Sequence, residues 1–323
     1  TYIGLGYHNT VTPSVILRNI LENPGWYTAY TPYQPEVSQG RLEMLMNFQQ
    51  MIIDLTGLDI ANASLLDEST AAAEAMMMAY KIKKNKHHTF CVQNSCHPQT
   101  LSVLRTRANP IGITIIEGKP NEDTFGCLIQ NPDTYGEIED LETLIKSNKS
   151  KEIISIVAAD IMSMVIMNSP GSYDADIVIG SSQRFGVPMG LGGPHAAFFA
   201  TKDEFKRLMP GRLIGVSVDR NNKRSYRMAL QTREQHIRRE KATSNICTAQ
   251  ALLAIVSAAY SIYHGPEGIK NISERVSQLA KSFADKIKQS GYELYSNYFF
   301  DTVTIITKEK TDQIYKNALN QKV

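Results

Sequence analysis

Short apolar segments alternate regularly with helical segments between residues 69 and 179. The apolar segments are Thr89–Val92, Ile113–Ile116, Cys127–Gln130, Ile153–Val157 and Ile177–Ile179. Helix signals near Ser69, Pro98 and Glu139 precede or separate them. Strands that alternate with helices usually lie parallel and are covered on both faces. The pattern therefore predicts an α/β fold built on a mostly parallel sheet.

The flanking regions differ from this central pattern. A short helix is expected after Thr12-Pro13, and a longer one from Ser38 to Gly57. The later segments are predicted to be strands at Leu213–Val218, Tyr226–Leu230 and Phe299–Thr307, and helices at Ala249–Tyr263, Gly268–Ser290 and from Thr311 onward.

A chain of 323 residues exceeds what one hydrophobic core usually supports. We therefore expect an N-terminal arm with a tyrosine-rich loop (1–40), a large domain (41–264) and the start of a small α/β domain (265–323). Because the chain begins without methionine and stops within a predicted helix, we expect a fragment trimmed at both ends.

Composition excludes several classes of function. The chain has 34 basic and 32 acidic side chains, a formal charge of +2, which offers no general attraction for nucleic acid or an anionic membrane. Its apolar stretches are too short to span a membrane. The four cysteines form no CxxC pair, so free thiols are expected and no metal site is predicted. A small molecule or a protein is the expected partner.

The most informative motif follows the last strand of the central pattern. Asp176-Ile-Val-Ile-Gly180 leads into Ser181-Ser-Gln-Arg184 and a glycine-rich turn that ends at Pro194. It is similar to the loop that delivers the cofactor lysine in pyridoxal-phosphate enzymes of the aminotransferase type, where the lysine amine forms a Schiff base. Arg184 stands near the place of that lysine, and no lysine occurs between Lys151 and Lys202. A guanidinium stays protonated and cannot supply the neutral amine.

Polar residues follow other strands, at the sheet edge where α/β folds bind ligands. Asp67-Glu68-Ser69-Thr70 precedes a helix and is either a plain N-cap or an anion site, although its two carboxylates would repel a phosphate. His97 could stack on a planar cofactor, and Asp160 could pair with a pyridine nitrogen; both could equally be loop residues or helix caps.

The loop Tyr30-Thr-Pro-Tyr-Gln-Pro-Glu-Val-Ser-Gln-Gly-Arg41 combines tyrosines and amides with two prolines. Such a rigid loop suits either the wall of a ligand site or a domain interface.

Long strings of this sequence go beyond a general fold type. They are Tyr30–Arg41, Asn62–Glu68, Gly180–Pro188, Gly192–Ala197, Gln231–Arg238 and Ala242–Thr248. These strings closely resemble the glycine decarboxylase P-protein family, over nearly the whole chain and in the N-terminal half of its long single-chain form. The resemblance implies fold type I of the pyridoxal-phosphate-dependent transferases.

The resemblance also implies the activity of the complete protein. Two similar halves pair as a pseudo-dimer, and the C-terminal half holds pyridoxal phosphate on its lysine. The enzyme decarboxylates glycine and passes the aminomethyl group to the lipoyl arm of the H-protein. A homodimer of the full chain is expected, in the bacterial cytoplasm or the mitochondrial matrix, and this fragment alone is expected to be inactive.

Two groups of site residues follow from the resemblance. The residues expected to reach the shared active site are Tyr30, Tyr33, Gln34 and Ser38. The residues expected to form a vestigial cofactor pocket are Glu68, Ser69, Thr70, His97, Asp160, Gln183 and Arg184. Two alternatives stay open: a docking platform that does not touch substrate, and another fold type I enzyme whose lysine lies outside this stretch.

Overall fold

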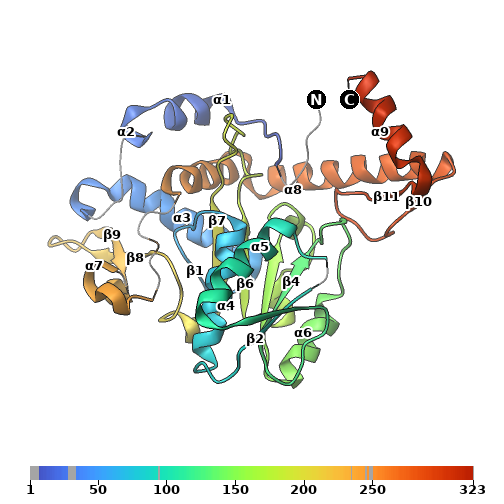
Figure 1. Cartoon of the computed structure of the whole chain (residues 1–323). Coiled ribbons are helices and arrows are strands. Elements are labelled where there is room, and N and C mark those ends of the chain that lie inside the picture. Colours follow the sequence, from blue (N-terminus) through green and yellow to red (C-terminus); the bar gives the residue numbers. More distant parts are fainter. Residues whose placement is uncertain are drawn as a thin grey trace.

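The computed structural model describes residues 7–27, 34–93, 95–233, 235–243, 246 and 250–322. Within these residues seven strands form one sheet in the order β1-β7-β6-β5-β4-β2-β3 (Figure 1). Their bounds are β1 Ile60–Ala61, β2 Thr89–Val92, β3 Thr114–Glu117, β4 Thr124–Asn131, β5 Ile154–Ala159, β6 Ile177–Ser181 and β7 Ala197–Thr201. Strands β3, β2, β4, β5 and β6 run parallel to one another. Strand β7 pairs antiparallel with both of its neighbours, β6 and β1. The predicted mostly parallel sheet is confirmed.

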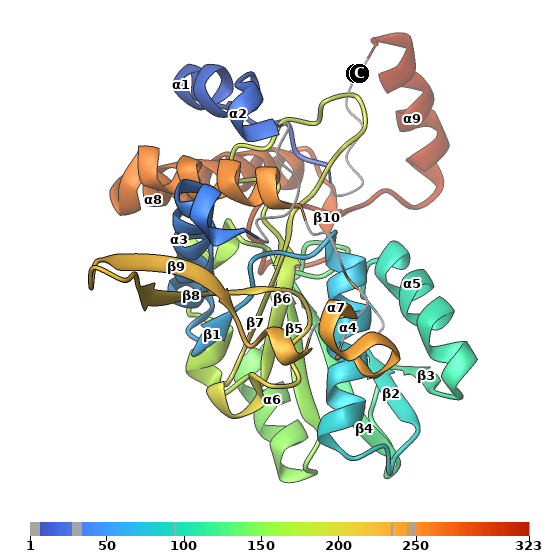
Figure 2. The same cartoon turned by 90° about the vertical axis from the view of Figure 1, so that its left-hand side faces the viewer.

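Helices cover both faces of this sheet (Figures 1 and 2). Helices α4 (Glu68–Ile82) and α5 (Pro98–Ala108) pack on one face, and α3 (Gln39–Thr56), α6 (Leu141–Ser150) and α8 (Ala251–Gln289) pack on the other. Strand β5 shows how the sequence makes this possible: Ile154 and Ile156 face the first group of helices, while Val157 faces the second. Both faces are apolar, as a strand in the middle of a covered sheet requires.

The N-terminal helical region departs from the expected cap. Helix α1 (Ser14–Ile16) continues into a π-helical turn at Leu17–Leu21, and α2 spans Pro24–Tyr27. The Thr12 hydroxyl does not cap α1 but donates to the carbonyl of Gly186, 2.8 Å away. This tertiary bond attaches the arm to the loop that follows β6.

Helix α3 begins and ends where expected. Ser38 occupies the N-cap position without a side-chain hydrogen bond, and Gly57 ends the helix in the left-handed conformation, with φ of 68°. The end is thus a glycine stop of the predicted kind.

The region after residue 211 contains a two-stranded ribbon, β8 (Leu213–Val218) with β9 (Arg224–Ala229). The two helices predicted next form α8, whose course breaks at Gly265, with φ of 65° and ψ of 175°. The division into large and small domains at residue 265 stays a prediction.

The strand predicted at Phe299–Thr307 is wrong. Only Ile305–Ile306 (β11) is a strand, paired with Glu293–Leu294 (β10), because Phe300 turns into the large hydrophobic core instead of joining a ladder. Helix α9 (Thr311–Asn320) then follows as expected. None of the helices in the described part of the chain is long and apolar enough to cross a membrane.

Candidate functional site

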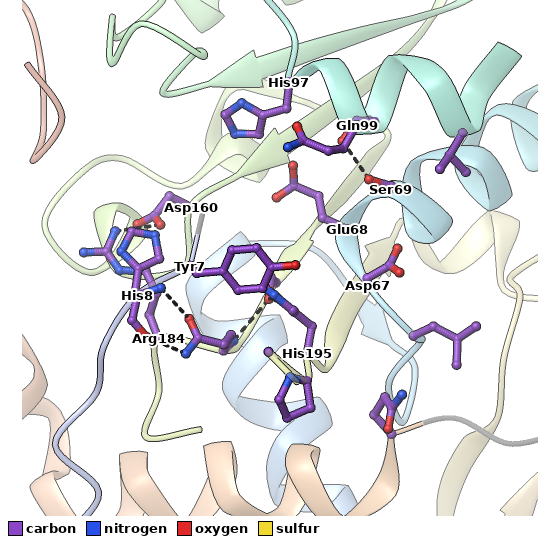
Figure 3. A pocket seen from close by; sticks show the side chains of 18 of the residues that line it. Tyr7, His8, Asp67, Glu68, Ser69, His97, Gln99, Asp160, Arg184 and His195 are labelled. Carbon is purple, nitrogen blue, oxygen red and sulfur yellow. Dashed lines mark hydrogen bonds and ion pairs between the residues drawn. The ribbon is translucent and has the colours of Figure 1, made fainter. Parts of the chain in front are cut away.

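A polar cavity of about 670 Å³ opens at the carboxyl edge of the sheet. Its walls come from the loops that follow β1, β2, β4, β5 and β6, together with the N-terminal arm. In Figure 3, Glu68 and Tyr7 lie near its centre, with Arg184 and Asp160 on one side. Gln250, just before α8, also lines the cavity, so the structure brings together residues from seven separate stretches at the edge where the sequence predicted a site.

Strands β5 and β6 pack closely at the point where the glycine-rich loop after β6 begins. A Cβ atom at Gly180 would lie 2.3 Å from the carbonyl oxygen of Ala159, so this position of β6 admits only glycine. Four residues later Arg184 enters the cavity wall, and its side chain is 10% exposed. The arginine therefore lines the cavity, while its correspondence to the cofactor lysine stays a prediction.

Two carboxylates bind the Arg184 guanidinium. Its Nη1 lies 2.8 Å from Oδ2 of Asp160, and its Nη2 lies 2.5 Å from Oδ2 of Asp301. Burial alone would raise the pKa of Asp160, but the charge and hydrogen bonds of Arg184 outweigh burial and lower it. The same two carboxylates raise the pKa of Arg184 against the effect of burial.

Asp160 also has the second role that the sequence left open. It follows β5, and its Oδ1 accepts a hydrogen bond of 2.8 Å from the backbone N–H of Ser163. It is therefore both a turn cap and the partner of Arg184, so the oxygen that could meet a pyridine nitrogen is already occupied.

The turn before α4 is a plain N-cap. Oδ1 of Asp67 accepts the backbone N–H of Thr70 at 2.7 Å, so the helix end has already satisfied that donor. Thr70 does not line the cavity, whereas Ser69 does and shares a 3.1 Å hydrogen bond with the hydroxyl of Thr100. The turn therefore has little to attract an anion, because it carries two carboxylates and the N–H of Thr70 is already bonded.

Glu68 is the most perturbed acid in this cavity. Burial raises its pKa to about 7, and the negative charges of Asp160 and Asp67 add to the effect, while a hydrogen bond with Gln130 opposes it. Glu68 is therefore close to half-protonated at neutral pH.

The histidines of the cavity are held neutral. Nδ1 of His97 lies 2.8 Å from the hydroxyl of Thr134, and Nδ1 of His195 lies 2.8 Å from that of Ser181. Burial lowers the pKa of both rings. His97 stands at the N-cap position of α5, and the ring of Tyr7 contacts His195 edge-on, with 5.4 Å between centroids.

Gln183 faces the arm as well as the cavity. Its Nε2 donates to the carbonyls of His8 and Val187, at 2.8 and 2.7 Å. Burial, with the nearby charge of Arg184, lowers the pKa of His8. These contacts hold the N-terminal arm against the loop that follows β6.

Pyridoxal phosphate does not fit this set of residues. Among the described residues no lysine lines the cavity, Asp160 is already paired with a guanidinium, and two carboxylates stand at the turn where a phosphate would bind. The cavity therefore holds an ion-pair site, and its origin as a vestigial cofactor pocket stays a prediction.

Of the four residues predicted to reach a shared active site, the structure describes two. Tyr30 and Tyr33 fall outside the described residues, and neither Gln34 nor Ser38 lines the cavity. Gln34 is exposed before the turn at Pro35–Val37, whereas Ser38 is buried. Their predicted role stays a prediction.

Several residues of this site were not predicted from the sequence. They include the cavity residues Tyr7, His8, Gln130 and His195, and the ion-pair partner Asp301. His195 directly follows the glycine-rich turn, which was a usable signal. Nothing local marked Asp301, which lies 117 positions from Arg184.

Comparisons with known proteins identify close relatives. A family model described as "Glycine cleavage system P-protein" matches residues 1–323. The glycine dehydrogenase (decarboxylating) of Pelagibacter ubique is 65% identical over 327 residues, covering 100% of this chain and 34% of that protein. The enzyme of the same name from Photobacterium profundum is 59% identical over 323 residues, covering 99% and 34%. The chain thus spans about a third of the length of these curated relatives.

Solved structures agree with the fold. A glycine decarboxylase (P-protein) of the glycine cleavage system, in inhibitor-bound form, superposes with a TM-score of 0.87 at 35% identity, over 93% of this chain and 71% of that one. A cysteine desulfurase from Thermococcus onnurineus, with a TM-score of 0.66 at 16% identity over 97% and 80%, shows the fold alone. The expected fold type I of pyridoxal-phosphate-dependent transferases is confirmed.

Proposed function

Because the chain belongs to the glycine cleavage system P-protein family, we propose that it forms the part of a glycine-decarboxylating enzyme that does not carry the cofactor lysine. The observation that carries this proposal is the ion-pair site in the cavity. Arg184 stands where the lysine is expected and is neutralised by Asp160 and Asp301. A guanidinium bound in this way has no neutral amine to offer.

The rest of the enzyme is proposed from the relatives. The polypeptide that these longer relatives contain in addition holds pyridoxal phosphate, which supplies an electron sink when bound. Glycine is the substrate, and the lipoyl group of the H-protein receives the aminomethyl group. The full protein is a homodimer and, in bacteria, works in the cytoplasm.

Within that enzyme this chain contributes one wall of the active site. The tyrosine-rich loop from residue 30 to residue 41 supplies the wall, with Tyr30, Tyr33, Gln34 and Ser38 as the contacting residues. The end of this loop is firmly placed, because Gln39 exchanges two hydrogen bonds of 2.8 Å with the backbone of Tyr226 on β9. These bonds support the proposal at the end of the loop that the structure describes.

The position of the cofactor can be tested directly on the full-length protein. We expect borohydride reduction followed by peptide mapping to find the reduced pyridoxyl group on one lysine outside residues 1–323. A stoichiometric adduct on any lysine within these residues would overturn the proposal.

The wall role needs a separate experiment. We expect Tyr30→Phe and Tyr33→Phe in the full-length protein to lower the rate of glycine-dependent CO₂ exchange with lipoylated H-protein, without changing thermal stability. Tyr298→Phe is the matched control, because Tyr298 is 75% exposed and belongs to a different segment. Normal turnover in both loop variants would favour a docking platform that does not touch substrate.

A further inference from the structure

Residues 295–304, here called the closing segment, return from the end of α8 to the carboxyl edge of the sheet. The backbone N–H of Ile138 donates to the carbonyl of Tyr298 at 2.9 Å, and the hydroxyl of Thr304 donates to the backbone carbonyl of Tyr135 at 2.8 Å. Phe299 forms an isolated β-bridge with Glu137. The closing segment is thus joined to the loop that follows β4.

The contact between the closing segment and the loop that follows β4, here called the joint, is very close. Gly136 has a φ of 88°, and a Cβ atom there would lie 2.1 Å from the carbonyl oxygen of Thr302. Phe300, next to Asp301, is only 2% exposed and packs in the core shared with α3 and α8. The closing segment therefore lies directly against the loop that follows β4 and the core beneath it.

Arg184 stands at the centre of this joint. It comes from the loop after β6, Asp160 from the end of β5, and Asp301 from the closing segment. The guanidinium also lies over the Phe300 ring, with Cζ 5.6 Å from the centroid. One side chain therefore contacts both sides of the joint.

The charges make this arrangement depend on the arginine. The Asp160 and Asp301 side chains are 22% and 15% exposed, and among the described residues each of them pairs with one cation, Arg184. His8 is near, but burial lowers its pKa and keeps it largely neutral. Two partly buried carboxylates near one another need a cation between them.

The planar fork of arginine suits this task better than lysine does. Nη1 reaches one carboxylate and Nη2 the other, so a single side chain makes both pairs at once. A lysine ammonium is a point charge on a flexible stem and cannot hold this two-sided geometry equally well.

We propose that Arg184 fastens the closing segment to the large domain through its paired contacts with Asp160 and Asp301, a role that takes the place of cofactor attachment. This role stands on the contacts within this chain and does not depend on the reaction of the complete enzyme.

Hydrogen exchange of the full-length protein, read by mass spectrometry, tests the proposal. Asp301→Asn keeps the shape of the side chain and leaves Arg184 paired with Asp160. We expect exchange in peptides covering residues 133–140 and 293–306 to accelerate by roughly tenfold to a hundredfold. Peptides from α4 (68–82) should exchange as in the wild type, which shows that the large domain stays folded.

Two further variants sharpen the result. Arg184→Met leaves both carboxylates without their cation and should accelerate exchange at the joint more than Asp301→Asn does. In the double variant, the free energy of local opening should fall by less than the sum of the two single effects, because both single changes remove the same contact. Asp285→Asn is the matched control, an exposed carboxylate on α8.

Wild-type exchange at the joint in Asp301→Asn would overturn the proposal. Equal acceleration across α4 and the joint would also overturn it, since it would show a general loss of stability instead of a local opening.

Discussion

Replacing Glu68 by glutamine removes a carboxylate that the fold tolerates poorly. The pKa of Glu68 rises from 4.5 to about 7, first because of burial and then because of the charges of Asp160 and Asp67. Since one pKa unit corresponds to about 1.4 kcal/mol, the ionised form costs the folded state about 3 kcal/mol. This figure is an upper bound, because Glu68 is partly exposed.

The sign of the pH dependence follows from this shift. Below pH 4.5 the carboxyl is protonated in both states, and no stability is lost. Between pH 4.5 and about 7 the unfolded chain gives up its proton while the folded chain keeps it, so the free energy of unfolding falls as pH rises. Above pH 7 the loss stays constant.

Glu68→Gln should therefore stabilise the protein, and more so at alkaline pH. We expect a gain of less than about 1 kcal/mol at pH 5 and up to about 3 kcal/mol at pH 8. Pulse proteolysis in urea at both values, read on peptides from α4, measures the difference. Glu142→Gln is the matched control, because Glu142 also lies in the first turn of a helix but is 54% exposed.

Two outcomes would refute the reasoning. One is a gain that is equal at pH 5 and pH 8, which would trace the effect to packing and not to charge. The other is a loss of stability at pH 8, which would mean that the ionised carboxylate makes a favourable contact.

Three further predictions concern the packing of this chain. Gly136→Ala should lower the melting temperature more than Gly112→Ala, because both glycines have positive φ but only the first would place its Cβ against a carbonyl, 2.1 Å away. Phe300→Ala should cost roughly 3 to 5 kcal/mol in urea unfolding, and Phe283→Ala, at a half-exposed site, less than about 1 kcal/mol. Burial raises the pKa of Cys96 to about 12, so it should resist iodoacetamide at pH 8 until urea is added; rapid labelling of the folded protein would contradict this.

The strand at residues 299 to 307 shows where pattern reasoning failed. Its alternation of apolar and polar residues fits a strand, but Phe300 gains more from burial in the core than a ladder position would provide. The backbone then pairs only at Ile305–Ile306. Tertiary contacts decided this segment, and they are not visible in a local window.

The candidate site divides in the same way. The residues that follow successive strands could be placed together in advance, because parallel strands bring their carboxyl ends to one edge, and Glu68, His97, Asp160 and Arg184 indeed line one cavity. Whether each would bind a ligand, cap a helix or pair with a neighbour could not be read from spacing.

By itself, the sequence determined the order of strands and helices, the edge that carries the polar residues, and the arginine in place of a lysine, because these depend on local periodicity and on residue type. Only the tertiary structure decided what that arginine does. Asp301 lies 117 positions away and reaches Arg184 because the chain leaves α8 and returns to the sheet. Charge pairing acts through space, so the partner that changes the meaning of Arg184 could be found only in the folded chain.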